Sequence, residues 1–374
     1  MNKRTAYTPG MSVLKERRQN MVIVAAGNQR TQIFPALTVS IELRRCVQTV
    51  DLTWVSLGNS RIRNMCRKHQ IHLIRSSINR KGTVKKVCQT VKETVQFTRM
   101  FGRNRPKAVV SFGGAEYIPV LAAARFRSVP YYLYEQDSVP SLTSRFFGKG
   151  ARKVFLGFPH AGPKPLHGAA ELTGVPLRPV NRPYDEKVYT RGFDRKKKTI
   201  LIISRQDQAS LINPYLLSVV EQWITKGYQI VWQTGKCDYK SIKQRFNNNS
   251  GIFIFKNIKD RYPYYAASRL VICRAETSIL SEIAYFGLPC IVIPRTTKKD
   301  NPLWINAGVV EMQGWGIRLV QDETLPQLLM EAAGNILEDD FRFELMCRKA
   351  LDHAPLNAAS RISRTICEDI FNRN

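Results

Sequence analysis

The chain has 374 residues, which is too long for one ordinary hydrophobic core and predicts two domains. Hydrophobic residues make up 44% and aromatic residues 10% of the chain, a composition that excludes a disordered protein. The net charge of +29 predicts a negatively charged partner, which is an anionic membrane, a nucleic acid or a phosphorylated substrate.

Three further classes of protein are disfavoured. No apolar run approaches the roughly 20 residues that span a bilayer. The eight cysteines form no CxxC pair and show no regular spacing, which argues against a metal site and a disulfide framework and predicts reduced thiols. No zinc finger, RNP-like strand or aromatic-interleaved basic run accompanies the charge, so nucleic acid is not an expected partner. We expect no cofactor either.

The first half of the chain begins with residues 1–20, which are basic but lack the apolar core of a signal peptide. We interpret them as a disordered leader. Short apolar runs then alternate with helical patterns, as in a parallel sheet whose two faces are covered by helices. The expected strands of this first sheet are residues 21–26, 52–56, 71–74, 108–112, 131–134 and 153–156.

A basic helix is expected between two of these strands, at residues 83–100. The stretch from Arg61 to Lys107 carries fourteen Lys or Arg and a single acid, Glu93. Four valines recur at helical spacing, and packing of these valines on the chain's own sheet is the favoured interpretation. The alternative is an interfacial helix on anionic lipid, and both can hold if lysines face the headgroups. The lysines expected to face the membrane are Lys81, Lys85, Lys86 and Lys92.

The second half of the chain repeats the alternation after a Pro-rich and charged passage. Its expected strands are residues 199–203, 229–233, 252–255, 270–273, 290–293 and 317–320, with helices that include 281–286 and 325–337. Two doubly wound α/β units joined by one linker place a ligand cleft between them, outside the carboxyl ends of the strands.

Seven colinear segments carry a resemblance to a known family. They include "IFPALTVSIELRR", "VVSFGG", "YEQDSVPSLTSRFFGKGARKVFLGFP", "LTGVPLRP", "VWQTGKCDYKSIKQRF" and "YYAASRLVICRAETSILSEIAYFGLPCIVIP". These segments resemble the MurG family, which transfers N-acetylglucosamine from UDP to lipid I and so completes the peptidoglycan precursor lipid II. The resemblance implies a cytoplasmic protein that is peripheral on the inner face of the cell membrane.

The resemblance also implies a GT-B fold, in which two Rossmann-like domains face each other across a cleft. Residues 21–175 would form the acceptor domain on the membrane side, and residues 176–198 the linker. Residues 199–340 would form the UDP-sugar domain, and helices in 341–374 would return to the first domain.

The first glycine loop departs from the family pattern. The family sequence is GGTGGH, whose glycines let backbone N–H groups approach a diphosphate and whose histidine is the proposed base. Here the loop is "GNQRTQ", and the base position is Gln32, an amide that cannot accept a proton near pH 7. We therefore assign no catalytic residue. The other altered positions of this loop are Asn28, Gln29, Arg30 and Thr31.

Other ligand positions of the family are altered as well. The second loop, GGSQGA in the family, is "SRQDQA" and brings in Arg205, Gln206, Asp207 and Gln208. Where the family has RAGA, this chain has "RAET", which places Glu276 and Thr277 at the last two positions. In the donor loop, Pro302 and Leu303 stand where the family has glutamines. In the first domain the altered positions are Ala115, Asp137 and Val175.

Five residues still match donor-side positions of the family. Glu282 matches the carboxylate that holds the ribose hydroxyls, and Ile258 the apolar residue against the uracil. Structural alternatives are an acid at a helix N-terminus for Glu282 and a helix cap for Ser281. The alternatives for Arg178 and Ile258 are a linker salt bridge and a core position. The five are Ser281, Glu282, Arg178, Ile258 and Asn306.

Three functions follow. The favoured one is a MurG-like fold whose motifs are degenerate and whose transfer activity is absent or nearly absent, with UDP-N-acetylglucosamine and lipid I bound weakly or not at all. The second is an active transferase that uses Arg30 and Arg205 on the diphosphate and Asp137 as base. The third is a non-catalytic protein that binds an anionic membrane or polymer through its charge.

Overall fold

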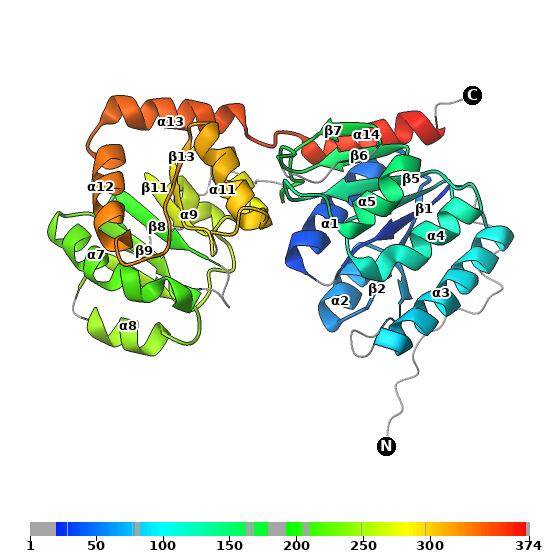
Figure 1. Cartoon of the computed structure of the whole chain (residues 1–374), viewed down its shortest axis with the longest axis horizontal. Coiled ribbons are helices and arrows are strands. Elements are labelled where there is room, and N and C mark those ends of the chain that lie inside the picture. Colours follow the sequence, from blue (N-terminus) through cyan, green and yellow to red (C-terminus); the bar gives the residue numbers. More distant parts are fainter. Residues whose placement is uncertain are drawn as a thin grey trace, which may run out of the picture.

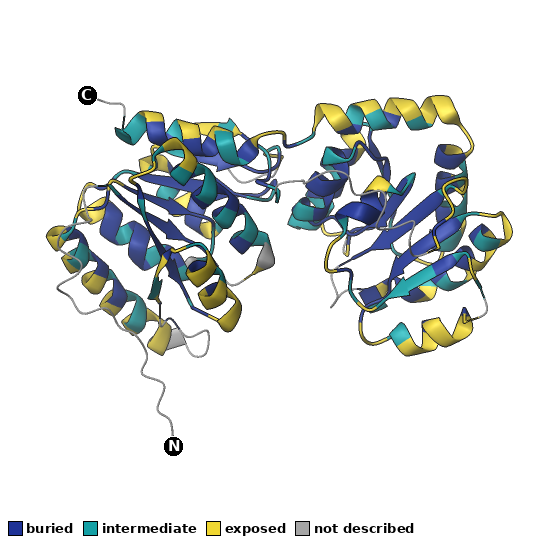
Figure 2. Cartoon of the chain, turned by 180° about the vertical axis from the view of Figure 1, so that it is seen from behind, coloured by how far each residue is buried: buried dark blue, intermediate teal, exposed yellow. Residues whose placement is uncertain are grey.

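The chain folds into two α/β domains that lie side by side in the computed structural model (Figure 1). The structure describes residues 20–27, 29–76, 78, 83–161, 166, 168–178, 192–204, 209–247, 249–295 and 297–371, and it leaves out the side chains of Arg30, Thr83, Val84 and Ala115. Figure 2 shows that the central strands of both domains are buried and that the outer faces of the helices are exposed.

The first domain is built on a parallel sheet with seven strands among the described residues, in the order β3-β2-β1-β4-β5-β6-β7. β1 is buried along its whole length, because helices cover both faces of the sheet. The strands are β1 (Met21–Ala25), β2 (Asp51–Ser56), β3 (His72–Arg75), β4 (Ala108–Ser111), β5 (Tyr131–Glu135), β6 (Lys153–Leu156) and β7 (Ala170–Leu172).

Helices cover this sheet on both faces. Val22 and Val24 of β1 pack with α1 (Arg30–Cys46) and α2 (Ser60–Lys68) on one face. Ile23 and Ala25 pack with α3 (Thr83–Arg103) and α4 (Ile118–Phe126) on the other. Alternate residues of one strand thus supply two cores. The remaining elements are α5 (Leu142–Phe147) and the short 3₁₀ helices η1 (Ala115–Tyr117) and η2 (Gly148–Gly150).

The favoured interpretation of the basic helix is wrong in one respect. In α3 it is Phe97 and Phe101 that pack on the sheet. The valines face solvent, with exposed fractions of 60% for Val87, 58% for Val91 and 43% for Val95. Both sets follow the helical repeat, and the aromatic rings remove more apolar surface from water when they are buried. The valines therefore form an exposed stripe.

The second domain has a six-stranded parallel sheet among the described residues, in the order β10-β9-β8-β11-β12-β13. Its strands are β8 (Thr199–Ile203), β9 (Gln229–Gln233), β10 (Ile252–Phe255), β11 (Leu270–Cys273), β12 (Cys290–Val292) and β13 (Gly316–Arg318). Its helices are α7 (Asn213–Thr225), α8 (Tyr239–Arg245), α9 (Tyr262–Ala266), α10 (Thr277–Tyr285), α11 (Pro302–Met312), α12 (Leu325–Leu337) and α13 (Asp340–Asp352), and η3 (Ala209–Leu211) is a 3₁₀ helix.

The end of the chain crosses from the second domain to the first (Figure 1). α13 packs on the second domain through Met346 and Ala350. Among the described helices of residues 341–371, α14 (Ala358–Phe371) returns to the first domain, where Ser363 Oγ donates to the Val39 carbonyl of α1 over 3.1 Å. The expected return to the first domain therefore does not include α13. The two doubly wound domains form a GT-B fold, as predicted.

Candidate functional site

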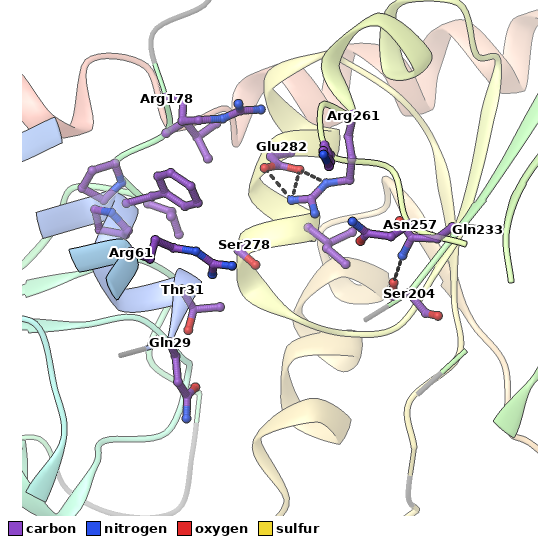
Figure 3. A pocket seen from close by; sticks show the side chains of 17 residues that line it. Gln29, Thr31, Arg61, Arg178, Ser204, Gln233, Asn257, Arg261, Ser278 and Glu282 are labelled. Atoms are coloured by element: carbon purple, nitrogen blue, oxygen red, sulfur yellow. Dashed lines mark hydrogen bonds and ion pairs between the residues drawn. The ribbon is translucent and has the colours of Figure 1, made fainter. Parts of the chain in front are cut away.

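A cavity of about 460 Å³ lies between the two domains. The strand order reverses between β1 and β4 in one sheet and between β8 and β11 in the other, which is where open parallel sheets bind ligands. Figure 3 shows residues from both domains around this cavity. Its lining includes Gln29, Thr31, Phe34, Pro35, Arg61, Val175, Pro176, Leu177, Arg178, Ser204, Gln233, Asn257, Lys259, Arg261, Ser278, Ile279 and Glu282.

The first loop is filled by one of its own side chains. Gln32 lies in the first turn of α1 and folds back over Gly27, so closely that a Cβ on Gly27 would overlap with Gln32 Oε1. The other end of the same amide faces Gly113, where a Cβ would lie 3.6 Å from Gln32 Nε2. In this arrangement the Gln32 amide occupies the space that a side chain at position 27 would take. Asn28 lies outside the described residues, as does the side chain of Arg30.

A second large side chain lies beneath this loop. Tyr117 is completely buried, and its hydroxyl donates to the Ala26 carbonyl over 2.6 Å. It occupies a position where the family has a small residue in the pattern GGYxSGP. The preceding Gly113 and Gly114 have φ angles of +81° and +105°, which L side chains rarely adopt. The backbone turn is therefore kept, while the space beside it is taken by an aromatic ring.

On the opposite wall, the carboxylate of Glu282 is held by Arg261. Arg261 Nε donates to Glu282 Oε2 and Nη2 donates to Oε1, both over 2.7 Å, which is a bidentate pair. The Tyr265 hydroxyl donates to Glu282 Oε2 over 3.0 Å. Burial alone would lower the pKa of Arg261, but the Glu282 carboxylate raises it above its usual value. The Glu282 carboxylate thus already has three donors from its own domain.

Arg178 also lines the cavity, near the Arg261–Glu282 ion pair (Figure 3). Its guanidinium lies over the Tyr262 ring at 4.7 Å from the centroid and over the Phe34 ring at 5.9 Å. Arg178 Nη2 also donates to Asp260 Oδ1 over 3.0 Å. The salt bridge named as its structural alternative is therefore present, and the side chain lines the cavity as well.

Five residues make an interdomain clasp, namely Gln136, Asp137, Ser138, Thr277 and Asn306. Thr277 Oγ1 donates to Asp137 Oδ1 over 2.9 Å and accepts from Gln136 Nε2 over 3.0 Å. Asn306 is completely buried, and its Oδ1 accepts from the Ser138 N–H over 3.2 Å. Burial raises the pKa of Asp137, although hydrogen bonds from Thr277 and Asn306 act to lower it. Residues of the two domains therefore form hydrogen bonds with one another here.

The remaining predicted positions serve the scaffold. Ser281 and Glu282 lie in the second turn of α10, so neither caps that helix; Glu276 is its N-cap residue. Ile258 is buried in a hydrophobic core of the second domain. Leu303 packs against the same core, and Val175 is buried in the cavity wall. Predicted positions outside the described residues are Lys81, Arg205, Gln206, Asp207 and Gln208.

The sequence did not point to Arg261, whose pairing with Glu282 depends on how α9 and α10 are placed. The replacement of a small residue by Tyr117 beside a glycine pair is visible in the sequence. The residue types of the first loop differ from the family pattern in the sequence, but the position of the Gln32 side chain over Gly27 is visible only in three dimensions.

Comparisons with known proteins agree with this geometry. The model for the glycosyltransferase family 28 N-terminal domain matches residues 22–156, and that for the C-terminal domain matches residues 199–362. The crystal structure of Acinetobacter baumannii MurG has a TM-score of 0.75 and 22% identity, and the alignment covers 93% of this chain and 99% of that one. At that identity the structural likeness supports the fold.

Two curated relatives cover nearly the whole chain. Both are named UDP-N-acetylglucosamine--N-acetylmuramyl-(pentapeptide) pyrophosphoryl-undecaprenol N-acetylglucosamine transferase. The protein from Actinobacillus pleuropneumoniae serotype 5b is 28% identical, and that from Bacillus pumilus is 24% identical. Each match covers 93% of this chain and 98% of the relative. Since both domain models of one family match in the same order, this chain belongs to glycosyltransferase family 28 and resembles its MurG members.

Proposed function

We propose that this chain is a MurG-like member of the family that transfers N-acetylglucosamine from UDP to lipid I at a negligible rate or not at all. The observation that carries the proposal is that polar side chains at two donor positions of the family already form hydrogen bonds within the chain. Glu282 is held by Arg261, and Asn306 is held within the interdomain clasp. A nucleotide sugar would have to displace both sets of bonds.

The catalytic requirements point the same way. Glycosyl transfer needs a base near the acceptor hydroxyl and donors that stabilise the charge growing on the departing diphosphate. Loss of a general base typically costs about 10²–10⁴-fold in rate, and loss of one preorganised donor a further 10²–10³-fold or so. Gln32 supplies no base, and its side chain occupies the space beside Gly27 where backbone donors would need access.

An active enzyme with substitute residues is less well supported. Asp137, the alternative base, is outside the set of residues that line the cavity and accepts a hydrogen bond from Thr277. Arg205, an alternative diphosphate ligand, lies outside the described residues, as does the side chain of Arg30.

A second proposed property is reversible binding to the anionic inner face of the cell membrane. It is supported by the exposed stripe of Val87, Val91 and Val95 on α3. Lys85, Lys86 and Lys92 are exposed on the same helix, which lies at the outer edge of the first domain (Figure 1). Apolar side chains flanked by lysines are typical of an interfacial helix. Within the described residues no helix is both long and apolar enough to span a bilayer.

A direct assay tests the absence of transfer. The protein is incubated with labelled UDP-N-acetylglucosamine and a lipid I analogue, and the relative from Actinobacillus pleuropneumoniae serves as the positive control. We expect no labelled product above the protein-free background. Sustained turnover by the wild-type chain would overturn the proposal.

A further inference from the structure

The C-terminal helix α14 packs along α1, on the first domain (Figure 1). Ile366 and Cys367 of α14 belong to the same hydrophobic core as Val39 and Leu43 of α1. Ser363 Oγ donates to the Val39 carbonyl in the same interface. This packing holds the end of the chain against the first domain.

Two cysteines meet in this interface. Cys46 is the last residue of α1, and the spacing of Val39, Leu43 and Cys46 places all three on one face of the helix. Cys367 lies one turn after Ser363, on the face of α14 that packs on α1. Both side chains are free thiols, and they share a hydrogen bond. The structure thus brings together two sulfur atoms from opposite ends of the chain.

The two thiols differ in their access to solvent. Cys46 is exposed, whereas Cys367 is 7% exposed. Burial raises the pKa of the Cys367 thiol to about 12, and the neighbouring Cys46 adds to the rise. A dissolved oxidant therefore reaches Cys46 first, while Cys367 stays a protonated thiol beside it. Oxidation of an accessible thiol next to a second thiol commonly ends in a disulfide.

We propose that Cys46 and Cys367 are a redox-sensitive pair, which forms a reversible disulfide between α1 and α14 when the chain is exposed to a peroxide. The Cys46 sulfur takes one oxygen atom from hydrogen peroxide, becomes a sulfenic acid and releases water. The Cys367 sulfur then bonds to the Cys46 sulfur, and the hydroxyl group leaves with the Cys367 proton as a second water. The two thiols lose two electrons and two protons, and the peroxide is reduced to water. A dithiol reductant restores both thiols by exchange.

The crosslink encloses most of the chain. It joins the first helix of the first domain to the last helix, so the whole second domain lies within the closed loop. A disulfide between such distant positions restricts the unfolded chain and stabilises the folded one. The oxidised protein should therefore have a higher thermal midpoint than the reduced protein. This proposal does not depend on whether the chain transfers N-acetylglucosamine.

Peptide mapping of the full chain tests the crosslink. The protein is treated with hydrogen peroxide, its remaining thiols are blocked with N-ethylmaleimide, and its tryptic peptides are analysed without reduction. We expect the Cys46 peptide to be linked to the Cys367 peptide, and dithiothreitol to release both. The thermal midpoint should rise on oxidation by at least about 2 °C and return on reduction. Oxidation of Cys46 to a sulfinic acid without any linked peptide would overturn the proposal.

Substitutions of single cysteines identify the partners. Cys46→Ser changes an exposed side chain, and it should abolish both the linked peptide and the rise in thermal midpoint. Cys367→Ala should leave the Cys46 sulfenic acid open to trapping by dimedone. The matched controls are Cys88→Ser and Cys237→Ser, which also change exposed thiols and should keep the link. A midpoint that rises equally in Cys46→Ser and in the wild type would contradict the crosslink.

A second thiol pair provides a comparison within the same molecule. Cys273 and Cys290 share a hydrogen bond as well, but both are completely buried on neighbouring strands β11 and β12. Because the oxidant cannot reach them in the folded protein, we expect them to stay reduced while Cys46 and Cys367 are linked. A Cys273–Cys290 disulfide that forms as fast as the proposed one would overturn the proposal, since exposure of Cys46 would then not direct the reaction.

Discussion

Asp137 of the first domain accepts a hydrogen bond from Thr277 of the second, with 2.9 Å between Asp137 Oδ1 and Thr277 Oγ1. Both residues stand at positions where the sequence departs from the MurG pattern. Two residues that differ from the family pattern therefore contact each other across the domain interface, although they lie 140 residues apart in the chain.

This contact predicts a defined loss of stability. Thr277→Val removes the hydroxyl that donates to Asp137 and accepts from Gln136. Leaving a carboxylate short of a donor at the interface should lower the free energy of unfolding by about 1–3 kcal/mol. Urea denaturation measures the change. The control Thr225→Val removes an exposed hydroxyl that donates to Glu221 O, and it should change stability by less than about 0.5 kcal/mol. Equal effects of the two substitutions would contradict the role of the clasp.

The same carboxyl group predicts a pH dependence. Burial raises the pKa of Asp137. A carboxyl group whose pKa is raised on folding contributes stability that is complete below its unfolded value of about 3.9 and is lost as the pH rises through the folded pKa. Asp137→Asn does not ionise, so its stability relative to the wild type should increase as the pH rises from about 4 through that folded pKa.

Urea midpoints of both proteins at a series of pH values measure this difference. The pKa of neighbouring Glu135 is also raised by burial, and taking the difference between the two proteins removes its contribution. A difference that stays constant with pH, or that decreases, would rule out the assignment to Asp137.

The Arg261–Glu282 pair predicts that substitutions at these two residues have non-additive effects on the free energy of unfolding. Arg261→Met removes the bidentate partner of Glu282, whose side chain is only 9% exposed in the wild type. Because the Arg261 side chain is 26% exposed and partly screened by solvent, the expected loss is about 1–3 kcal/mol rather than the full cost of a buried pair. The double variant Arg261→Met/Glu282→Gln should recover part of that loss. The exposed pair Arg245–Glu221 is the control, and Arg245→Met should leave the urea midpoint nearly unchanged.

The exposed face of α3 predicts salt-sensitive vesicle binding. Lys85→Gln/Lys86→Gln/Lys92→Gln should weaken sedimentation with anionic vesicles at low salt, by about 1 kcal/mol per lysine. Val87→Ser/Val91→Ser/Val95→Ser should weaken it at high salt too, because apolar contact is not screened. Lys196→Gln/Lys197→Gln/Lys240→Gln, which changes exposed lysines outside the first domain, is the charge-matched control. Binding that changes as much in this control as in the α3 lysine variant would place the membrane contact elsewhere.

Much of the fold was predictable from the sequence. The bounds expected for β6, β8, β9, β10 and β11 are those observed. Each of these strands is an apolar run next to a helical pattern, so local sequence and tertiary burial agree. β7 was not predicted. It has three residues at the sheet edge, and their partly exposed side chains form no apolar run.

The site was predictable only as a set of positions. The sequence shows that Gln32 replaces the histidine of the family and so cannot act as a base. The orientation of the Gln32 side chain over Gly27 depends on the backbone turn, which the sequence does not reveal. The Arg261–Glu282 pair joins two helices, and no local pattern in the sequence links them. In α3, two apolar stripes compete for one buried face, and periodicity alone does not select between valines and phenylalanines.

The proposed absence of transfer is expected to depend on several parts of the site. Rebuilding the first loop alone, with Asn28→Gly, Gln29→Thr, Arg30→Gly, Thr31→Gly and Gln32→His, should give no transfer to a lipid I analogue. Arg261 would still hold Glu282, and the clasp would still hold Asn306. Rebuilding both loops and the donor-side positions should produce transfer, with the thermal midpoint of each variant as the folding control. Transfer by the first-loop variant would mean that one loop alone accounts for the loss.

The most direct measurement of the central claim is an isothermal titration of the wild-type chain with UDP-N-acetylglucosamine. Arg261 occupies the carboxylate of Glu282, Asn306 is buried in the clasp and Gln32 fills the first loop. We therefore expect no saturable heat up to about 1 mM, which corresponds to a binding free energy weaker than about −4 kcal/mol. Saturable binding with a dissociation constant of about 1 μM would contradict the claim, because the site would then still accept the nucleotide sugar.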